Sequence, residues 1–90
     1  MGYPNPASSQ VNFLFDADQP THLKFVITDE QLNIIYRSGL NIHPPATVIF
    51  AMNLTTIAAF KKGAYYRIYY ALYDESAIIY KRGHGDFQKL

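Results

Sequence analysis

Hydrophobic and polar residues alternate along much of the chain, which is the pattern of a β-strand with one buried face. In the first such segment Val11, Phe13 and Phe15 share one face, and Asn12 and Leu14 share the other. Similar segments recur every 8–15 residues, and no internal repeat or βαβ pattern is visible. The alternation predicts six strands, over residues 11–15, 22–28, 32–37, 47–52, 64–73 and 77–82.

Turn-forming residues separate these segments. Residues 16–20 have turn-forming Asp and Pro, and Asp29-Glu30-Gln31 can also turn the chain. The pair Pro44-Pro45 excludes regular pairing just before the fourth strand. Ser38-Gly39 is expected to end the third strand, and residues 83–86, Gly-His-Gly-Asp, are expected to break the chain after the sixth. Residues 53–60 are the one stretch expected to form a helical turn. The tail to residue 90 leaves room for a short seventh strand.

Together these segments predict an all-β fold, an immunoglobulin-like antiparallel β-sandwich of six to seven strands. Residues 1–9, rich in Pro, Asn and Ser, are interpreted as a linker or entry segment, and residues 10–90 as a single domain. The expected core is made by the apolar faces of the strands: Phe13, Phe15, Leu23, Phe25, Ile27, Val48, Phe50 and one face of residues 64–73.

Composition limits the classes of function. The chain has 90 residues, of which 49% are hydrophobic and 16% aromatic, with a net charge of +1 and no cysteine. This charge balance does not favour binding to nucleic acid or to an anionic membrane, and no apolar run is long enough to span a bilayer. The first residues lack the features of a signal peptide. Without cysteine the chain has neither disulfides nor thiolate metal sites.

Candidate catalytic and metal-binding residues are few. His22, His43 and His84 are far apart in sequence and lack the spacing of a metal pair. His84 and Asp86 are the best local pair, because alternate residues of an extended segment point the same way, but a glycine-rich turn is the favoured interpretation. Asp16 and Asp18 supply too few oxygen ligands for calcium. We therefore predict no catalytic residue, no metal site and no cofactor, and hence a protein that is not an enzyme.

Five tyrosines lie in the fifth predicted strand, at positions 65, 66, 69, 70 and 73. They could form a stacking platform for sugars or bases. Because Tyr65 and Tyr69 have opposite parity to Tyr66 and Tyr70, the alternation divides them between the two faces of the strand. The favoured interpretation is that one set belongs to the core and the other to the sheet surface.

Several motifs, in order, resemble one family. An entry segment with Tyr3, Pro4, Asn5 and Pro6 precedes a short strand, and a Gly-x-Tyr strand start, with Gly63 and Tyr65, comes much later. Between them lie the strand Leu23-Lys24-Phe25-Val26-Ile27-Thr28-Asp29, the pair Ile34-Ile35 and the turn Asn53-Leu54-Thr55-Thr56-Ile57. This order, over residues 3–82, resembles the C-terminal sorting domains of the type IX secretion system of Bacteroidetes. The family ends near its last Lys/Arg-bearing strand, here Lys81-Arg82, whereas this chain continues to Leu90.

The resemblance implies a non-catalytic address label in a longer protein that is secreted, or displayed on the cell surface, by way of the periplasm. Its implied partners are the outer-membrane translocon and a sortase-like peptidase that removes the domain, with no nucleic acid and no membrane insertion. Tyr3, Pro4, Asn5, Pro6, Lys81 and Arg82 would serve entry or recognition, and Gly63 and Tyr65 the fold. The alternative is an accessory or spacer domain of a cell-surface protein, which could bind protein or carbohydrate through its surface tyrosines.

Overall fold

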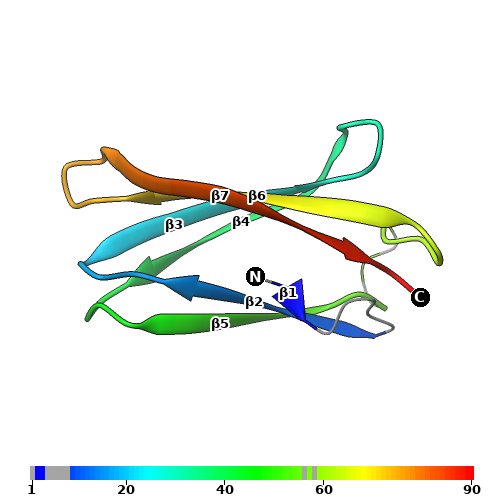
Figure 1. Ribbon diagram of the computed structural model, residues 1–90, viewed down its shortest axis with the longest axis horizontal. Helices are drawn as coiled ribbons and strands as arrows, with labels where there is room; N and C mark the ends of the chain where they lie inside the picture. The colour runs from blue at the N-terminus through cyan, green and yellow to red at the C-terminus, as the bar shows by residue number, and fades with distance from the viewer. Residues whose placement is uncertain (1, 4–8, 56, 58) are drawn as a thin grey trace.

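Two antiparallel sheets lie face to face in this computed structural model, which describes residues 2–3, 9–55, 57 and 59–90 (Figure 1). One sheet has the strand order β1-β2-β5 and the other the order β4-β3-β6-β7. The all-β sandwich predicted from the alternation is confirmed. The strands are β1 (Gly2–Tyr3), β2 (Gln10–Asp16), β3 (Thr21–Thr28), β4 (Ile34–Ile42), β5 (Thr47–Asn53), β6 (Tyr65–Tyr73) and β7 (Ile79–Gln88).

Connections between the strands gather at the two ends of the sandwich. Figure 1 shows the β2–β3, β4–β5 and β6–β7 connections at one end, and the β3–β4 hairpin, the β5–β6 connection and the C-terminus at the other. The two prolines expected to exclude pairing do lie between β4 and β5, and the His43–Pro44 peptide bond is cis. Each sheet pairs strands that are far apart in sequence, β2 with β5 in one and β3 with β6 in the other.

The core lies between the inner faces of the two sheets, where the predicted alternation places it. Val11, Phe13 and Phe15 of β2 are fully buried. The predicted apolar residues of β3 are also buried, and Val48 and Phe50 of β5 are partly buried against them. Phe25 lies near the centre, with ring centroids 5.1 Å from Phe50 and 6.0 Å from Phe15. Such aromatic pairs add to the free energy gained by burying their area.

The turn at the start of β6 is fixed by one buried tyrosine. The Tyr66 hydroxyl accepts a hydrogen bond from the Lys61 N–H (2.6 Å) and donates one to the Ala59 carbonyl (3.3 Å). Its ring packs edge-on against Phe60, with centroids 5.0 Å apart. Gly63, between these residues and the strand, has a φ of 83°, in the left-handed region that glycine adopts without steric cost. This glycine sets the direction in which β6 begins.

The stretch 53–60, of which residues 56 and 58 lie outside the described part of the chain, contains no helix among its described residues but one hydrogen-bonded turn where a helical turn was expected. Its apolar side chains nevertheless dock on the core: Leu54 and Phe60 are buried, and Ile57 packs against them. A single turn is closed by the hydrogen bond from the Phe60 N–H to the Ile57 carbonyl (3.1 Å). The segment thus covers one end of the sandwich with three apolar side chains.

The third strand differs from its prediction at both ends. Leu32 belongs to the preceding turn, with a φ of 66°, and β4 runs from Ile34 to Ile42. Ser38 and Gly39 do not end the strand, because their backbones pair with Phe25 and Lys24 of the continuous neighbour β3. A Cβ atom at Gly39 would lie 2.9 Å from the Leu23 carbonyl oxygen, so this position in the ladder admits only glycine without movement.

The last strand was also predicted too short, and the break expected at residues 83–86 is wrong. β7 continues to Gln88, and Gly83 pairs with Tyr70 of β6. The Tyr70 ring occupies the space above Gly83, since a Cβ there would lie 2.5 Å from the tyrosine hydroxyl. Phe87 is buried against Phe13, with ring centroids 5.5 Å apart. Residues 83–88 are therefore part of the core sheet rather than a tail.

Candidate functional site

The residues predicted for entry and recognition do not form one cluster. Tyr3 lies in β1, where its backbone pairs with Asn12, and Pro4, Asn5 and Pro6 lie outside the described residues. Lys81 and Arg82 are exposed near the beginning of β7, opposite Leu72 and Ala71 of β6.

Gly63 and Tyr65, predicted to support the fold, lie at the other end of the β6–β7 ribbon. The Gly63 N–H donates to the Lys89 carbonyl (2.6 Å), and Tyr65 pairs with Gln88. Most of the length of β7 therefore separates these two positions from Lys81 and Arg82. Gly63 and Tyr65 therefore belong to the end of the ribbon next to the β5–β6 connection.

The tyrosines of β6 divide between the two faces, as predicted. Tyr66 is buried and Tyr70 is partly buried in the core, whereas Tyr65 and Tyr69 are 55% and 36% exposed on the outer face of the four-stranded sheet. Tyr73 shares their parity on the same strand. Three tyrosines, four positions apart, thus follow one strand across the outer face.

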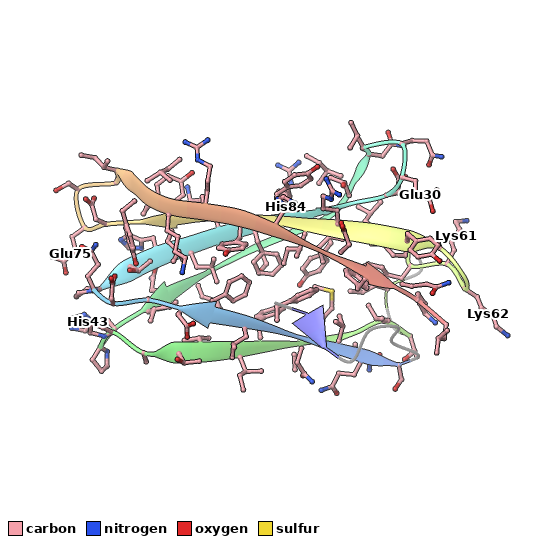
Figure 2. All side chains as sticks on the ribbon, viewed as in Figure 1. Glu30, His43, Lys61, Lys62, Glu75 and His84 are labelled. Carbon is pink, nitrogen blue, oxygen red and sulfur yellow. The ribbon has the colours of Figure 1, made fainter. Side chains whose placement is uncertain are left out.

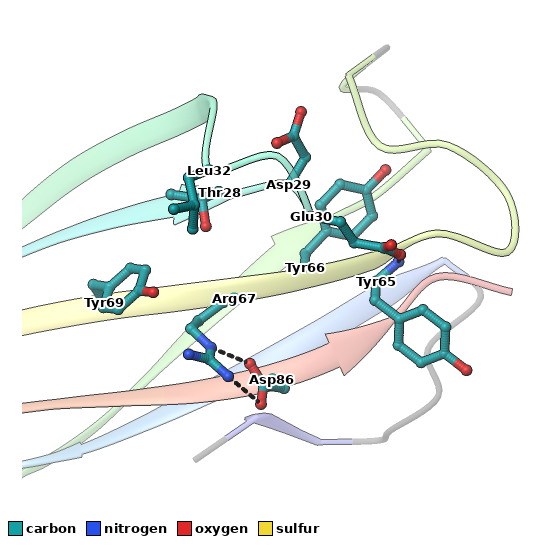
Figure 3. A pocket seen from close by; sticks show the side chains of 9 residues that line it. All are labelled: Thr28, Asp29, Glu30, Leu32, Tyr65, Tyr66, Arg67, Tyr69 and Asp86. Carbon is teal, nitrogen blue, oxygen red and sulfur yellow. Dashed lines mark hydrogen bonds and ion pairs between the residues drawn. The ribbon is translucent and has the colours of Figure 1, made fainter.

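A hollow of about 420 Å³ lies beside Tyr65 and Tyr69, at the end of the sheet near the β3–β4 turn (Figure 3). Its centre holds an ion pair: the Arg67 Nε and Nη2 atoms donate to the two carboxylate oxygens of Asp86, at 2.6 and 3.2 Å. The Arg67 guanidinium holds the pKa of the Asp86 carboxyl below its ordinary value, and Asp86 raises the pKa of Arg67. Because each group neutralises the other, neither is poised as an acid, base or nucleophile.

Asp29, on the rim of this hollow, has a structural role. Its Oδ1 atom accepts hydrogen bonds from the backbone N–H groups of Gln31 and Asn33, both at 2.9 Å, and its Oδ2 atom accepts one from the Asn33 amide (3.1 Å). These donors, with the Asn33 N–H as the largest influence, lower the pKa of Asp29. The carboxylate closes the β3–β4 turn and stays ionised.

The three histidines lie apart from one another. His22 binds Asn41 across the β3–β4 pairing, with 2.6 Å between Nδ1 and Oδ1, and His43 lies at the end of the sandwich opposite Lys61 and Lys62 (Figure 2). His84 shares the outer face of β7 with Asp86, as alternate positions of an extended strand require, and lies against Tyr69 at 6.1 Å between ring centroids. Among the described residues no group of three or more His, Asp or Glu side chains could hold a metal ion.

The cross-strand Arg67–Asp86 pair is the polar feature that the sequence interpretation missed. The parity of β6 already places Arg67 on the face of Tyr65 and Tyr69. Its partner lies 19 positions away in the segment interpreted as a break, so that the pairing register of β6 and β7 was needed to find it.

The C-terminal strand lies at an edge of its sheet. β7 pairs with β6 on one side, and no other strand among the described residues pairs with it, although the two-residue β1 lies nearby. In residues 79–82, the part of β7 that carries Lys81 and Arg82, the outer edge of the strand pairs with no other strand among the described residues. An edge strand of this kind can be recognised by a partner that adds a strand to the sheet.

Comparisons with known proteins add no family. The chain matches no family model, and no curated protein matches it in sequence. In the part of the chain that the structure describes, no helix has the length and apolar character needed to cross a membrane.

Proposed function

We propose that this chain is a non-catalytic C-terminal sorting domain of a secreted bacterial protein, recognised by the type IX secretion machinery and removed during export. The observation that carries the proposal is the order of the motifs from Tyr3 to Arg82, which spans nearly the whole chain. In this account the outer-membrane translocon reads the folded domain, and a sortase-like peptidase cuts upstream of Tyr3. The parent protein reaches the cell surface or the medium.

Two features of the molecule support this function. The domain is a small sandwich whose last strand is an edge strand, and a terminal edge strand keeps backbone groups and alternate side chains readable. Lys81 and Arg82 are exposed on that strand. A folded domain can therefore present Lys81 and Arg82 at the edge of β7, with their side chains on opposite faces of the sheet.

The immunoglobulin-like character of the sandwich is also a proposal. The pairs β2–β5, β3–β6 and β6–β7 match the pairs B–E, C–F and F–G of immunoglobulin sandwiches, although β4 joins β3 here. The Tyr66 hydroxyl, bound to the backbone of Ala59 and Lys61 at the start of β6, matches the tyrosine corner of those domains. An NMR map of strand pairing that joined β2 to β3 instead of β5 would contradict it.

The sorting function is tested by fusing residues 1–90 to the C-terminus of a periplasm-directed fluorescent reporter. We expect the reporter on the surface or in the medium of a bacterium that has the type IX system, and in the periplasm of a strain without its translocon. A folded, stable reporter that stays in the periplasm of both strains would contradict the proposal.

Matched charge reversals test whether β7 is the recognised strand. Lys81→Glu with Arg82→Glu changes two exposed residues of β7, and Lys61→Glu with Lys62→Glu makes the same change of charge in the β5–β6 connection. All four side chains are exposed, so both variants should keep the circular dichroism spectrum and melting temperature of the wild type. We expect only the first variant to lose export. Equal export of the two variants would contradict a role for Lys81 and Arg82.

A further inference from the structure

A groove crosses the outer face of the four-stranded sheet between β4 and β6, and it is separate from the hollow around Arg67. Its volume is about 520 Å³, and its lining includes Lys24, Val26, Arg37, Ala71 and Tyr73. The floor is low because Lys24 is flanked in register by Gly39 of β4 and Ala71 of β6, two residues with minimal side chains. The backbone contact of Gly39 with Leu23 described above maintains this low floor.

The rim of the groove is basic. Lys24 of β3 lies opposite Gly39, and Arg37 lies two positions before Gly39 on β4. Arg82 of β7 lies opposite Ala71, on the far side of β6. All three are exposed, and no carboxylate of the described residues forms an ion pair with them. The one carboxylate on the strands of this face, Asp86, is held by Arg67. The other acidic residues lie at strand ends or in turns: Asp16, Asp18, Asp29, Glu30, Asp74 and Glu75.

The three cations lie farther apart than successive phosphates of a nucleic-acid strand. Lys24 and Arg37 are diagonal neighbours on adjacent strands, about 7–8 Å apart at the backbone. Lys24 and Arg82 are two strands apart, or about 10 Å. A nucleic-acid strand carries a charge about every 3.4 Å, and it would bring many more charges close to the acidic turns at both ends of the sheet than this rim can neutralise.

Tyrosine rings border the groove. The Lys24 Nζ lies 5.3 Å from the centroid of the Tyr73 ring. Tyr69 lies four positions earlier on the same strand, beside Val26, with the Arg67 guanidinium 5.9 Å from the centroid of its ring. An aromatic ring offers a broad apolar face with a polar tip, against which the C–H face of a sugar ring packs. Cations next to such rings then reach acidic groups on the same sugar.

An extended acidic peptide fits this face less well. Peptides that bind as strands draw their affinity from main-chain hydrogen bonds at a sheet edge. The floor of the groove belongs to β3, β4 and β6, and the backbone of β3 is paired on both sides. Recognition here must therefore come from side chains, as it does for a carbohydrate.

We propose that this basic groove binds an acidic polysaccharide whose sugar rings carry carboxylates, such as a uronate polymer. Lys24, Arg37 and Arg82 contact the carboxylates, and Tyr73 and Tyr69 pack against sugar rings above the floor made by Gly39 and Ala71. This binding goes beyond the sorting function and does not depend on it, since a purified domain would bind whether or not a secretion machinery reads it.

The test uses the purified 90-residue protein and polygalacturonate, with dextran as the uncharged control, by calorimetry and amide chemical shifts. We expect binding to polygalacturonate alone, weakened by added salt, with the largest shifts at Val26, Gly39 and Ala71. Lys24→Ser with Arg37→Ser should weaken binding about tenfold or more, whereas Lys61→Ser with Lys62→Ser, which removes the same charge elsewhere, should leave it unchanged.

A second variant keeps the test independent of charge. Ala71→Phe fills the floor from the outer face, where it meets no core residue, and should abolish binding while the melting temperature stays near that of the wild type. Three results would overturn the proposal: no binding to polygalacturonate, equal loss in the Lys61/Lys62 variant, or equally tight binding of polyglutamate or single-stranded DNA. Equally tight binding of polyglutamate or single-stranded DNA would show that the face binds acidic polymers in general.

Discussion

At the scale of single residues, two aspartates organise the two hairpin turns in the same way. Asp29 and Asp74 each accept two backbone N–H groups through Oδ1, at 2.9 Å, from the residues two and four positions later. In each turn the residue three positions after the aspartate has a positive φ, 66° at Leu32 and 63° at Ala77. These are left-handed positions that favour glycine, so both turns hold a strained residue in place by a carboxylate.

Replacing Ala77 by glycine should therefore stabilise the domain. The change relieves the contact between Cβ and the backbone at positive φ, which stabilises the folded state. It also increases the entropy of the unfolded chain, which offsets part of this effect and leaves a net gain in stability of about 0.5–1 kcal/mol. Chemical denaturation measures the difference. Ala46→Gly, in an exposed loop without a positive φ, is the control and should destabilise slightly. A loss of stability in Ala77→Gly would contradict the strain at this turn.

The lowered pKa of Asp29 predicts a change of stability in acid. Its carboxylate is stabilised in the folded protein by the N–H groups of Asn33 and Gln31, so its pKa lies below the ordinary 3.8. A group of this kind stabilises the fold above its unfolded pKa, and that contribution is lost as the pH falls through the lower folded value. The melting temperature should therefore fall below about pH 4, and less steeply in Asp29→Asn. Carboxyl NMR titration locates the transition, and a midpoint at or above 3.8 for Asp29 would contradict the account.

At the scale of elements, β7 is the strand that completes the core. It contributes Phe87, whose ring meets Phe13, Phe60 and Tyr66, and it closes the ribbon through the backbone bonds of Lys89 to Gly63 and Ala64. Gly83, which would weaken an isolated strand, is covered by Tyr70. Pairing with β6 along its whole length holds this strand in place.

Truncation after Arg82 should consequently unfold the domain. It removes the second half of β7 and exposes the apolar surface beneath Phe87, at a cost of about 3–5 kcal/mol for the aromatic side chain alone. Thermal melting followed by circular dichroism should lose its cooperative transition. Deletion of Leu90 alone, which is 49% exposed, should leave the melting temperature near that of the full chain. A cooperative transition after removal of residues 83–90 would show that β7 can end at Arg82.

The strands that could be predicted from the sequence are those in which one buried face sets the alternation of apolar and polar residues. β2, β3 and β6 alternate apolar and polar side chains over nearly their full lengths, because one face of each meets the core. The ends of β4 and β7 could not be predicted in this way. Ser38, Gly39 and Gly83 are weak strand formers held by their neighbours, Phe25, Lys24 and Tyr70.

The candidate sites depended on register even more strongly. The alternation placed Lys24, Arg67 and Tyr69 on an outer face, but it left open which strands lie next to each other. Only the order β4-β3-β6-β7 joins Arg67 to Asp86 and brings Arg37 and Arg82 to the two sides of Lys24. Sequence parity predicts the face of a side chain, whereas its neighbours come from tertiary pairing.

At the scale of the whole molecule, acidic, basic and apolar side chains occupy different regions. Apart from Asp86, the carboxylates occupy strand ends and turns, whereas most cations lie on the outer face of the four-stranded sheet or at the end near Lys61 and Lys62. The core between the sheets is apolar and aromatic. The sorting proposal assigns the C-terminal edge strand to a secretion machinery, and the groove proposal assigns the outer face to a ligand. The two surfaces meet at Arg82, but separate experiments address them.

The sorting function is tested most directly by the location and intact mass of the reporter after fractionation of cells that have the type IX system. The account predicts a reporter on the surface or in the medium whose mass shows that the chain was cut upstream of Tyr3, so that the whole domain is missing. A reporter that stays in the periplasm with all 90 residues attached and folded would contradict it.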